Sequence, residues 1–233
     1  MGSLGDGAVS LLARIQRLED IHDINNLMGR RAYYHSAGRH DLEFNELWSS
    51  EDDVIFEPED WGAFVGRASV KGSYVDGNPF PPGTKGLLIE HTLTTSVLEI
   101  AKDGLTAKGV WISPGHETFP IPGEKLPKTH WSWGRYAVDF RKEDGEWKIW
   151  HLHVLTTFRT PYNVDWAETA FRKPDYLPKD GETIGDIAKA DRGVSFNEPY
   201  HPSRAPKLQP VPPKAYNTWT DTWSAVEYHE HKG

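Results

Sequence analysis

Histidine and tyrosine side chains gather in stretches where apolar and polar residues alternate. His151 and His153 lie two residues apart, so a β-strand would place both rings on one face. Tyr136 and His91 lie in two earlier stretches of the same character. A neutral imidazole accepts a proton near pH 7, and a buried tyrosine hydroxyl stabilises a developing enolate or phenolate. These residues predict acid–base chemistry: β-elimination of water, retro-aldol loss of a small aldehyde, or a proton-shift isomerisation.

The predicted strands bring these side chains together. A strand over 147–158 has two faces, one with Trp147, Ile149, His151 and His153 and the other with Trp150, Leu152 and Val154. Pairing of Phe140 with Trp147 across the turn places Tyr136 opposite His151. We therefore expect one hollow to be lined by His91, Tyr136, His151 and His153.

Further candidates lie at the ends of predicted elements. Tyr33 and Tyr34 are adjacent, so a helix turns only one of them toward the hollow and leaves the other for packing. His35 follows, and it either closes the hollow or complements the negative end of the helix dipole. Arg159 ends the last strand, where it binds an anionic substrate group or pairs with an acidic neighbour. Trp111 completes the predicted substrate-binding wall.

Composition excludes several classes of function. The 233 residues include no cysteine, which rules out a thiolate nucleophile, a disulfide scaffold and a Cys-ligated metal site. Lys+Arg 26 against Asp+Glu 34 gives a net charge of −8 without a basic run, so we expect no nucleic-acid partner. No apolar run approaches the ~20 residues that span a bilayer. Because the first residues also lack the basic start of a signal peptide, we expect no membrane association and a cytoplasmic location.

The spacing of His151 and His153 also fits half of a zinc or iron site, with His91 as a third ligand. No carboxylate lies in phase on that strand, and the glycine and glutamate that accompany His-x-His in cupins are absent from the sequence. Nucleotide-binding glycine motifs and Gly-x-Ser-x-Gly are absent as well. We therefore expect no metal and no cofactor, with a metal-dependent oxygenase as an alternative hypothesis.

The order of the predicted elements indicates an α+β domain. Apolar residues recur every three or four positions over 9–31, which predicts an amphipathic helix. Short helices are predicted over 41–48 and 68–75, strands over 54–57, 63–65, 87–100, 105–113, 131–140 and 147–158, and a loop over 114–128. Helices then pack on one face of a curved antiparallel or mixed sheet.

The last part of the chain differs in composition. Residues 161–233 hold nine of the 17 prolines together with many aromatic residues, whereas a flexible solvated linker would be poor in aromatics. We predict a domain over 1–160 and an extended arm over 161–233 that lies over the cavity mouth or on a neighbouring subunit. Trp150, Leu152 and Val154 would give the sheet an apolar outer face, which predicts a homodimer or homotrimer.

Several segments resemble the NTF2-like superfamily, and most of all its SnoaL-like branch. The resemblance covers residues 10–160, and it is carried by residues 33–35 (Tyr-Tyr-His), 66–67 (Gly-Arg), 90–95 (Glu-His-Thr-Leu-Thr-Thr), 135–140 (Arg-Tyr-Ala-Val-Asp-Phe) and 144–149 (Asp-Gly-Glu-Trp-Lys-Ile). This branch includes scytalone dehydratase and bile-acid 7α-dehydratase, with ketosteroid isomerase more distant. The resemblance implies a cone: a bent sheet wrapped around the first helices, with a deep apolar cavity at its open end.

The resemblance also implies roles for particular residues. In the dehydratase members a tyrosine near the end of the first helix and a histidine opening the third strand act at the cavity, and these match Tyr33 or Tyr34 and His91. The Asp that commonly follows the tyrosine is replaced within His35 to Gly38, so a carboxylate base of the ketosteroid-isomerase kind is not expected.

The function that follows is a cofactor-independent lyase. Its expected substrate is a hydrophobic ring-containing molecule with hydroxyl groups, such as a lignin-derived phenol, a polyketide or a steroid, which loses water or formaldehyde. Two alternatives stay open: a non-catalytic module for ligand binding or assembly, because this fold hosts many functions, and an isomerase of the ketosteroid-isomerase kind.

Overall fold

The computed structural model describes residues 3–58, 61–120, 123, 125–170 and 189–227. Its helices are α1 (Ser3–Ser36), α2 (His40–Leu47), α3 (Arg67–Lys71) and α4 (Trp166–Thr169), with a π-helical turn at Gly72–Asp76 and a 3-10 turn at Trp219–Asp221. Within these ranges no helix is both long and apolar enough to cross a membrane.

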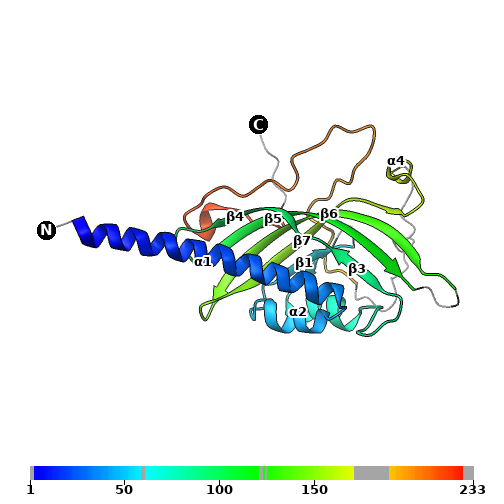
Figure 1. Ribbon diagram of the computed structural model, residues 1–233, viewed down its shortest axis with the longest axis horizontal. Coiled ribbons are helices and arrows are strands. Elements are labelled where there is room, and N and C mark those ends of the chain that lie inside the picture. Colours follow the sequence, from blue (N-terminus) through cyan, green and yellow to red (C-terminus); the bar gives the residue numbers. More distant parts are fainter. Residues whose placement is uncertain (1–2, 59–60, 121–122, 124, 171–188, 228–233) are drawn as a thin grey trace.

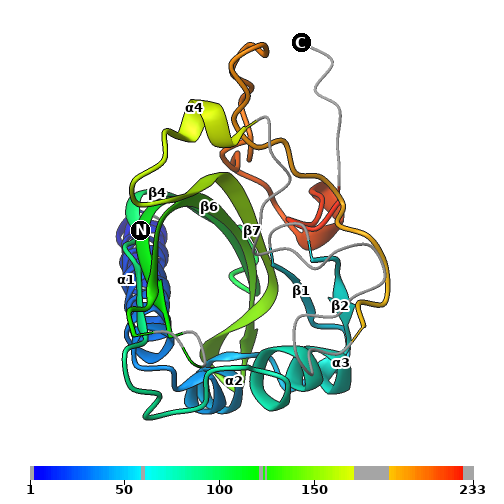
Figure 2. The ribbon, with the colours of Figure 1, turned by 90° about the vertical axis from the view of Figure 1, so that its right-hand side faces the viewer.

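Seven strands form one mixed sheet. They are β1 (Ile55–Pro58), β2 (Phe64–Val65), β3 (Leu88–His91), β4 (Thr94–Ile100), β5 (Thr106–Phe119), β6 (Lys128–Glu143) and β7 (Glu146–Pro161). The order is β2-β1-β7-β6-β5-β3, β4 also pairs with β5, and only β1 and β7 run parallel. Figure 2 shows the sheet curling over α1, α2 and α3. The predicted α+β cone is confirmed.

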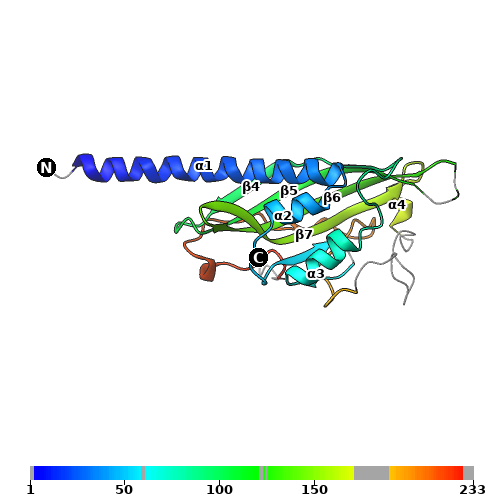
Figure 3. The same cartoon turned by 90° about the horizontal axis from the view of Figure 1, so that it is seen from below.

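Helix α1 is longer than the predicted 9–31 and packs on the sheet only through its second half. Ile24 and Met28 are buried against the sheet, whereas Leu12 and Leu18 are each 66% exposed. The first turns extend past the edge of the sheet (Figures 1 and 3). Gly38, at φ +67°, follows the helix in the left-handed conformation that ends many helices. The end of α1 at Ser36 fixes which of its last residues face inward.

The strand predicted over 87–100 is two strands, and the loop predicted over 114–128 is largely sheet. The chain leaves the ladder between His91 and Thr94, and Thr95 adopts φ +48°. Both halves still pair with β5, which continues to Phe119 because β6 pairs with it along its whole length. Residues near 115–119 therefore face the cavity from a strand.

A β-bulge in β7 reverses the predicted faces of that strand. Asp139 pairs with His151 and Phe140 pairs with Ile149, so Trp150 is the extra residue. Because side chains alternate, this extra residue turns the side chains that follow to the opposite face, as far as the next register shift at Thr157. The predicted placement of His151 in the hollow is therefore wrong, and so is the predicted pairing of Phe140 with Trp147.

The same reversal corrects the neighbouring residues. His153 also lies on the outer face, where it contacts Phe196 of the C-terminal segment. Leu152 is fully buried in the core and Val154 faces inward, so the apolar outer face that they were predicted to form is absent from this strand. Tyr136 lies opposite Val154 rather than His151.

Of the predicted arm, the structure describes residues 161–170 and 189–227, and residues 189–227, called the arm below, cross the outer face of the sheet (Figure 2). Asp139 accepts hydrogen bonds from Ser224 Oγ at 2.8 Å and from the Ala225 amide at 2.7 Å. Glu57 accepts from Ser195 at 3.0 Å and 2.7 Å and forms an ion pair with Arg192 at 2.7 Å. The described residues of the arm thus cover the outer face and contribute nothing to the lining of the inner cavity.

Candidate functional site

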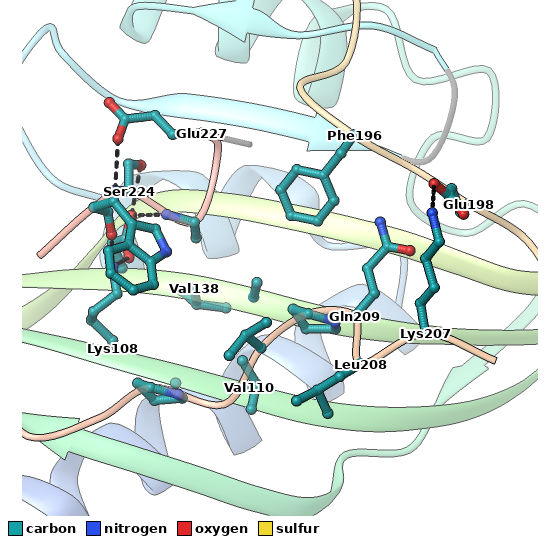
Figure 4. Close-up of a pocket in the computed structure, with 18 residues that line it drawn as sticks. Lys108, Val110, Val138, Phe196, Glu198, Lys207, Leu208, Gln209, Ser224 and Glu227 are labelled. Carbon is teal, nitrogen blue, oxygen red and sulfur yellow. Dashed lines mark hydrogen bonds and ion pairs between the residues drawn. The ribbon is translucent and has the colours of Figure 1, made fainter. Parts of the chain in front are cut away.

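Two cavities compete as the candidate site, and one lies under the arm. It has a volume of about 440 Å³ and lies between the outer face and the arm, with walls that include Val110, Val138 and Phe196 (Figure 4). Both of its lysines form ion pairs: Lys108 Nζ lies 2.7 Å from Asp139 Oδ1, and Lys207 Nζ lies 2.6 Å from Glu198 Oε1. No histidine or tyrosine is among the described residues that line this cavity, so it does not offer the imidazole and phenol groups that the predicted chemistry requires.

The second cavity lies inside the cone and has a volume of about 160 Å³. Its apolar wall includes Phe56, Trp61, Phe64, Phe80, Ile89 and Phe119. Its polar groups are Arg31, His35, His40, Ser73, Tyr74, Asn78, His91, Glu117, Tyr136 and Arg159. An apolar hollow with convergent polar and titratable groups is the usual form of a small-molecule site. We therefore take the inner cavity as the candidate active site.

The structure brings four of the predicted site residues to this cavity: His35, His91, Tyr136 and Arg159. It places the others elsewhere. Tyr33 is 81% exposed, and the Tyr34 hydroxyl donates to Glu46 at 2.7 Å. Trp111 is buried against Phe140 with ring centroids 6.2 Å apart, and His151 and His153 lie under the arm.

Helical geometry explains why His35 faces the cavity and the two tyrosines do not. Ile24 and Met28 form the buried stripe of α1, and Arg31 and His35 continue that stripe at steps of three or four residues. Tyr33 and Tyr34 fall off the stripe because the helix continues without a break to Ser36. The sequence signal for Arg31 and His35 is their spacing: they continue the steps of three or four residues that begin with Ile24 and Met28.

His91 lies in a dyad with Glu117. The imidazole Nε2 is 3.2 Å from Glu117 Oε1, and the other carboxylate oxygen contacts Arg159. Burial raises the pKa of Glu117, but Arg159 and His91 outweigh that effect and hold the pKa below its usual value. Since Glu117 is then a carboxylate and can only accept, His91 donates from Nε2, and Nδ1 is the basic nitrogen of the neutral ring. Glu117 escaped prediction because it lies in the segment taken for a loop.

A chain of hydrogen bonds fixes the tautomers of two further histidines. Asn78 Oδ1 accepts from the Phe80 amide at 2.9 Å, so its amide nitrogen donates to His40 Nδ1 at 2.6 Å. His40 then carries its proton on Nε2 and donates it to His35 Nδ1 at 2.9 Å. Burial lowers the pKa of His40 to about 4 and that of His35 well below its usual value. Both rings are therefore neutral near pH 7, and His35 keeps its proton on Nε2.

A buried ion pair supports the tyrosines of the cavity. Arg31 Nε lies 3.1 Å from Glu43 Oε1, and both side chains are almost completely buried. The Tyr74 hydroxyl donates to Glu43 at 2.6 Å, and burial raises the pKa of Tyr74 well above its usual value. The Arg31 guanidinium lies 4.8 Å from the centre of the Tyr136 ring and hydrogen-bonds its hydroxyl. Because arginine only donates, the Tyr136 oxygen accepts, which strengthens its O–H as a donor.

The polar cluster under the arm has the residue types of a hydrolase triad but not its geometry. Ser224 Oγ and Asp139 Oδ2 lie 3.0 Å and 2.9 Å from the same nitrogen, Nδ1 of His151. A nucleophile and its orienting carboxylate need opposite nitrogens of the ring. Ser224 also donates to Asp139, so this cluster anchors the arm. Among the described residues, no three or more His, Asp or Glu side chains are grouped to hold a metal ion.

The curved sheet wrapped around the first helices, with a cavity inside the cone, defines a class of small α+β proteins. The family model of the SnoaL-like domain matches residues 16–153, and the chain belongs to this family. The resemblance seen in the sequence is confirmed. Among curated proteins, no significant match is found.

Solved structures of the same fold agree with this assignment. A scytalone dehydratase-like protein of Novosphingobium aromaticivorans DSM 12444 has a TM-score of 0.51 at 16% identity, over 64% of this chain and 92% of that one. Hexachlorocyclohexane dehydrochlorinase LinA-type3 of Novosphingobium barchaimii LL02 has 0.50 at 17%, over 66% and 95%. The Kfla4162 protein of Kribbella flavida has 0.51 at 13%, over 62% and 95%. At such low identities the likeness shows the fold alone.

Proposed function

We propose that this protein is a cofactor-independent lyase that removes water, or formaldehyde by retro-aldol-type cleavage, from a hydroxylated aromatic or polycyclic molecule. The observation that carries the proposal is the His91–Glu117 dyad in an apolar cavity, with Nε2 and Oε1 3.2 Å apart. The fold shared with dehydratase-like and dehydrochlorinase proteins supports an elimination, since both leaving groups depart after a proton is removed from the neighbouring carbon.

In the proposed elimination, His91 Nδ1 takes the proton from the carbon next to the one that bears the hydroxyl. The electron pair of the broken C–H bond forms a C=C double bond as the C–O bond breaks, and the imidazolium of His91 returns the proton to the departing hydroxyl, which leaves as water. Glu117 holds the imidazole in one tautomer and stabilises the imidazolium that forms. Arg159 keeps Glu117 ionised throughout the step.

Hydrogen-bond donors in other parts of the cavity wall stabilise the charge that develops during the reaction. The Tyr136 O–H, polarised by Arg31, hydrogen-bonds the developing enolate or phenolate oxygen of the substrate. His35 lines the same cavity as a neutral ring, so it assists the departing hydroxyl by hydrogen bonding and keeps its own proton. These residues take over the role first assigned to Tyr33 or Tyr34, whose hydroxyls lie outside the cavity.

Formaldehyde release would use the same groups on a lignin-derived phenolic. The phenolic proton and the benzylic hydroxyl would first leave together as water, which gives a quinone methide. His91 would then take the proton of a primary hydroxyl, the C–C bond would break with release of formaldehyde, and its electron pair would restore the aromatic phenolate, whose oxygen Tyr136 stabilises. A ketosteroid-isomerase-like proton shift is less well supported, because Glu117, the carboxylate among the described residues of the lining, is bound by Arg159. A non-catalytic binding module is also less well supported, because ligand binding alone does not require the His91–Glu117 dyad.

Turnover of a panel of hydroxylated phenolics tests the proposal. New C=C bonds would be followed by ultraviolet absorbance, and formaldehyde by a colorimetric assay. We expect His91→Ala to lower kcat/KM by at least about 100-fold, the usual contribution of a general base. Tyr33→Phe, on an exposed side chain, is the matched control and should keep full activity. Full turnover by His91→Ala, or none by the wild type, would overturn the proposal.

A homodimer or homotrimer stays a prediction. Its original basis has changed, since Leu152 and Val154 face inward, and the exposed apolar residues that remain include Leu12 and Leu18 on α1. Light scattering on the purified protein measures the assembly directly.

A further inference from the structure

The charges around the inner cavity cancel in pairs. Arg31 faces Glu43 with Nε and Oε1 3.1 Å apart, and Arg159 contacts Glu117. All four side chains are at most 8% exposed, so each guanidinium has a carboxylate as its partner within the protein. The cavity therefore offers a substrate no uncompensated cation.

Two of the histidines that line the cavity add no charge to this balance. His35 and His40 are neutral near pH 7 because burial disfavours their protonated forms. His91 is the base of the proposed reaction and works from its neutral form. The remaining titratable side chains of the lining, Tyr74 and Tyr136, are neutral phenols that serve as hydrogen-bond donors. The described lining is thus largely apolar, and both of its arginines are paired with carboxylates.

The volume of the inner cavity limits the size of the ligand that it can hold. An apolar cavity of about 150 Å³ is known to hold one benzene ring, and this cavity measures about 160 Å³. Phe56, Phe64, Phe80 and Phe119 supply flat walls for such a ring. A fused second ring would need the walls to move apart.

Resting on the proposed function, we infer that the substrate is an uncharged molecule that places a single aromatic ring in this cavity, and that a carboxylate group on that ring excludes it. A carboxylate would lose its hydration without gaining a cation, because both arginines are already paired. The Glu117–Arg159 and Glu43–Arg31 pairs are therefore the specificity determinants for charge.

Calorimetric binding of matched ligands to the full chain tests this inference without any turnover. 4-Hydroxybenzamide and 4-hydroxybenzoate have nearly the same shape and differ in charge. We expect the benzoate to bind at least about tenfold more weakly. Equal or tighter binding of the benzoate, or no binding of the amide, would overturn the inference. If the amide binds selectively and no phenolic is turned over, the proposed function alone fails.

One substitution should reverse the preference. Glu117→Gln keeps the shape of the side chain but leaves Arg159 without its carboxylate, so the benzoate should gain affinity relative to the amide by at least about tenfold. Glu90→Gln, on an exposed side chain of β3, is the matched control and should leave the ratio unchanged. An unchanged ratio in a folded Glu117→Gln would contradict the role of the pair, and the wild-type comparison stands even if that variant does not fold.

Ring size is tested with phenol and 2-naphthol on the wild type. Larger apolar area normally favours the bicyclic ligand. In a cavity for one ring the order reverses, so we expect phenol to bind more tightly. Tighter binding of 2-naphthol would overturn the single-ring part of the inference.

Discussion

His91 and Glu117 lie on the neighbouring strands β3 and β5, with the imidazole Nε2 3.2 Å from the carboxylate Oε1. The register of these strands pairs His91 with Gly115, two residues before Glu117 on the same face. A Cβ on Gly115 would lie 2.7 Å from the Ser132 carbonyl oxygen, 2.9 Å from that of Glu90 and 3.1 Å from His91 Nδ1, so glycine lets the strands and the ring pack this closely. The strand pairing itself therefore builds the dyad.

Removing the carboxylate of this dyad should impair catalysis more than binding. Glu117→Gln takes away the charge that orients His91 and stabilises its protonated form, so we expect kcat on a neutral substrate to fall by about 10- to 100-fold. KM should change by less than about threefold, because glutamine keeps the shape of this part of the cavity wall. Steady-state kinetics measure both, and a variant that raises KM alone would show that Glu117 acts only in binding.

The hydroxyl that works inside the cavity should be that of Tyr136. Tyr136→Phe removes the donor that faces the substrate, and we expect kcat/KM to fall by about 10- to 100-fold. Tyr34→Phe removes a hydroxyl that donates to Glu46 outside the cavity, and it should retain nearly full activity. The opposite ranking of the two variants would return the catalytic role to the end of α1.

These two tyrosines show where sequence reasoning reached its limit. The resemblance pointed to the end of the first helix, and the helix does deliver a residue to the cavity, but its continuation to Ser36 makes that residue His35. The fold and His91 were predictable because they depend on regular periodicity and on a motif. Tyr74 and Glu117 were not, since a π-helical turn and a strand that continues through Pro114 carry no such signal.

The β-bulge at Trp150 set a second limit. Alternation placed His151 and His153 on the face of Ile149, and one inserted residue moved both to the outer face. No local feature of the sequence marks this residue as the bulge, because tryptophan fits a regular strand equally well. His151 and His153 lie on the same face of the strand, as predicted, but that face contacts the arm and not the cavity.

The stability of the protein should fall as the pH drops below the ordinary pKa of histidine. His40 has a pKa of about 4 in the folded protein, because burial disfavours the charged ring, and 6.5 when unfolded. Below pH 6.5 the unfolded chain therefore binds a proton that the folded protein does not, so the free energy of unfolding decreases with falling pH. The loss from His40 develops between about pH 6.5 and 4 and reaches about 3 kcal/mol.

Urea unfolding at several pH values checks this expectation. His40→Gln cannot titrate, so its free energy of unfolding should depend less steeply on pH in this window. His22→Gln, on the exposed face of α1, is the control and should keep the wild-type slope. Parallel curves for the wild type and His40→Gln would contradict the assignment of a neutral buried ring.

The arm should be held to the sheet by one buried carboxylate. Asp139 is completely buried and receives hydrogen bonds from Lys108 at 2.7 Å, from Ser224 at 2.8 Å and from the Ala225 amide at 2.7 Å. Burial raises the pKa of Asp139, but Lys108 and His151 outweigh it and lower the pKa to about 2. The carboxylate thus stays charged over the range in which the protein would be studied.

Replacing that carboxylate leaves the buried Lys108 without a counter-charge. We therefore expect Asp139→Asn to lower the free energy of unfolding by about 3–5 kcal/mol, or to release the arm where the sheet survives without it. Denaturant unfolding measures the first outcome, and limited proteolysis within 189–227 detects the second. Asp144→Asn removes the same charge from an exposed turn and should change neither. An Asp139→Asn protein as stable and as protease-resistant as Asp144→Asn would mean that the arm is held by its apolar contacts with the outer face, such as that of Phe196 with His153.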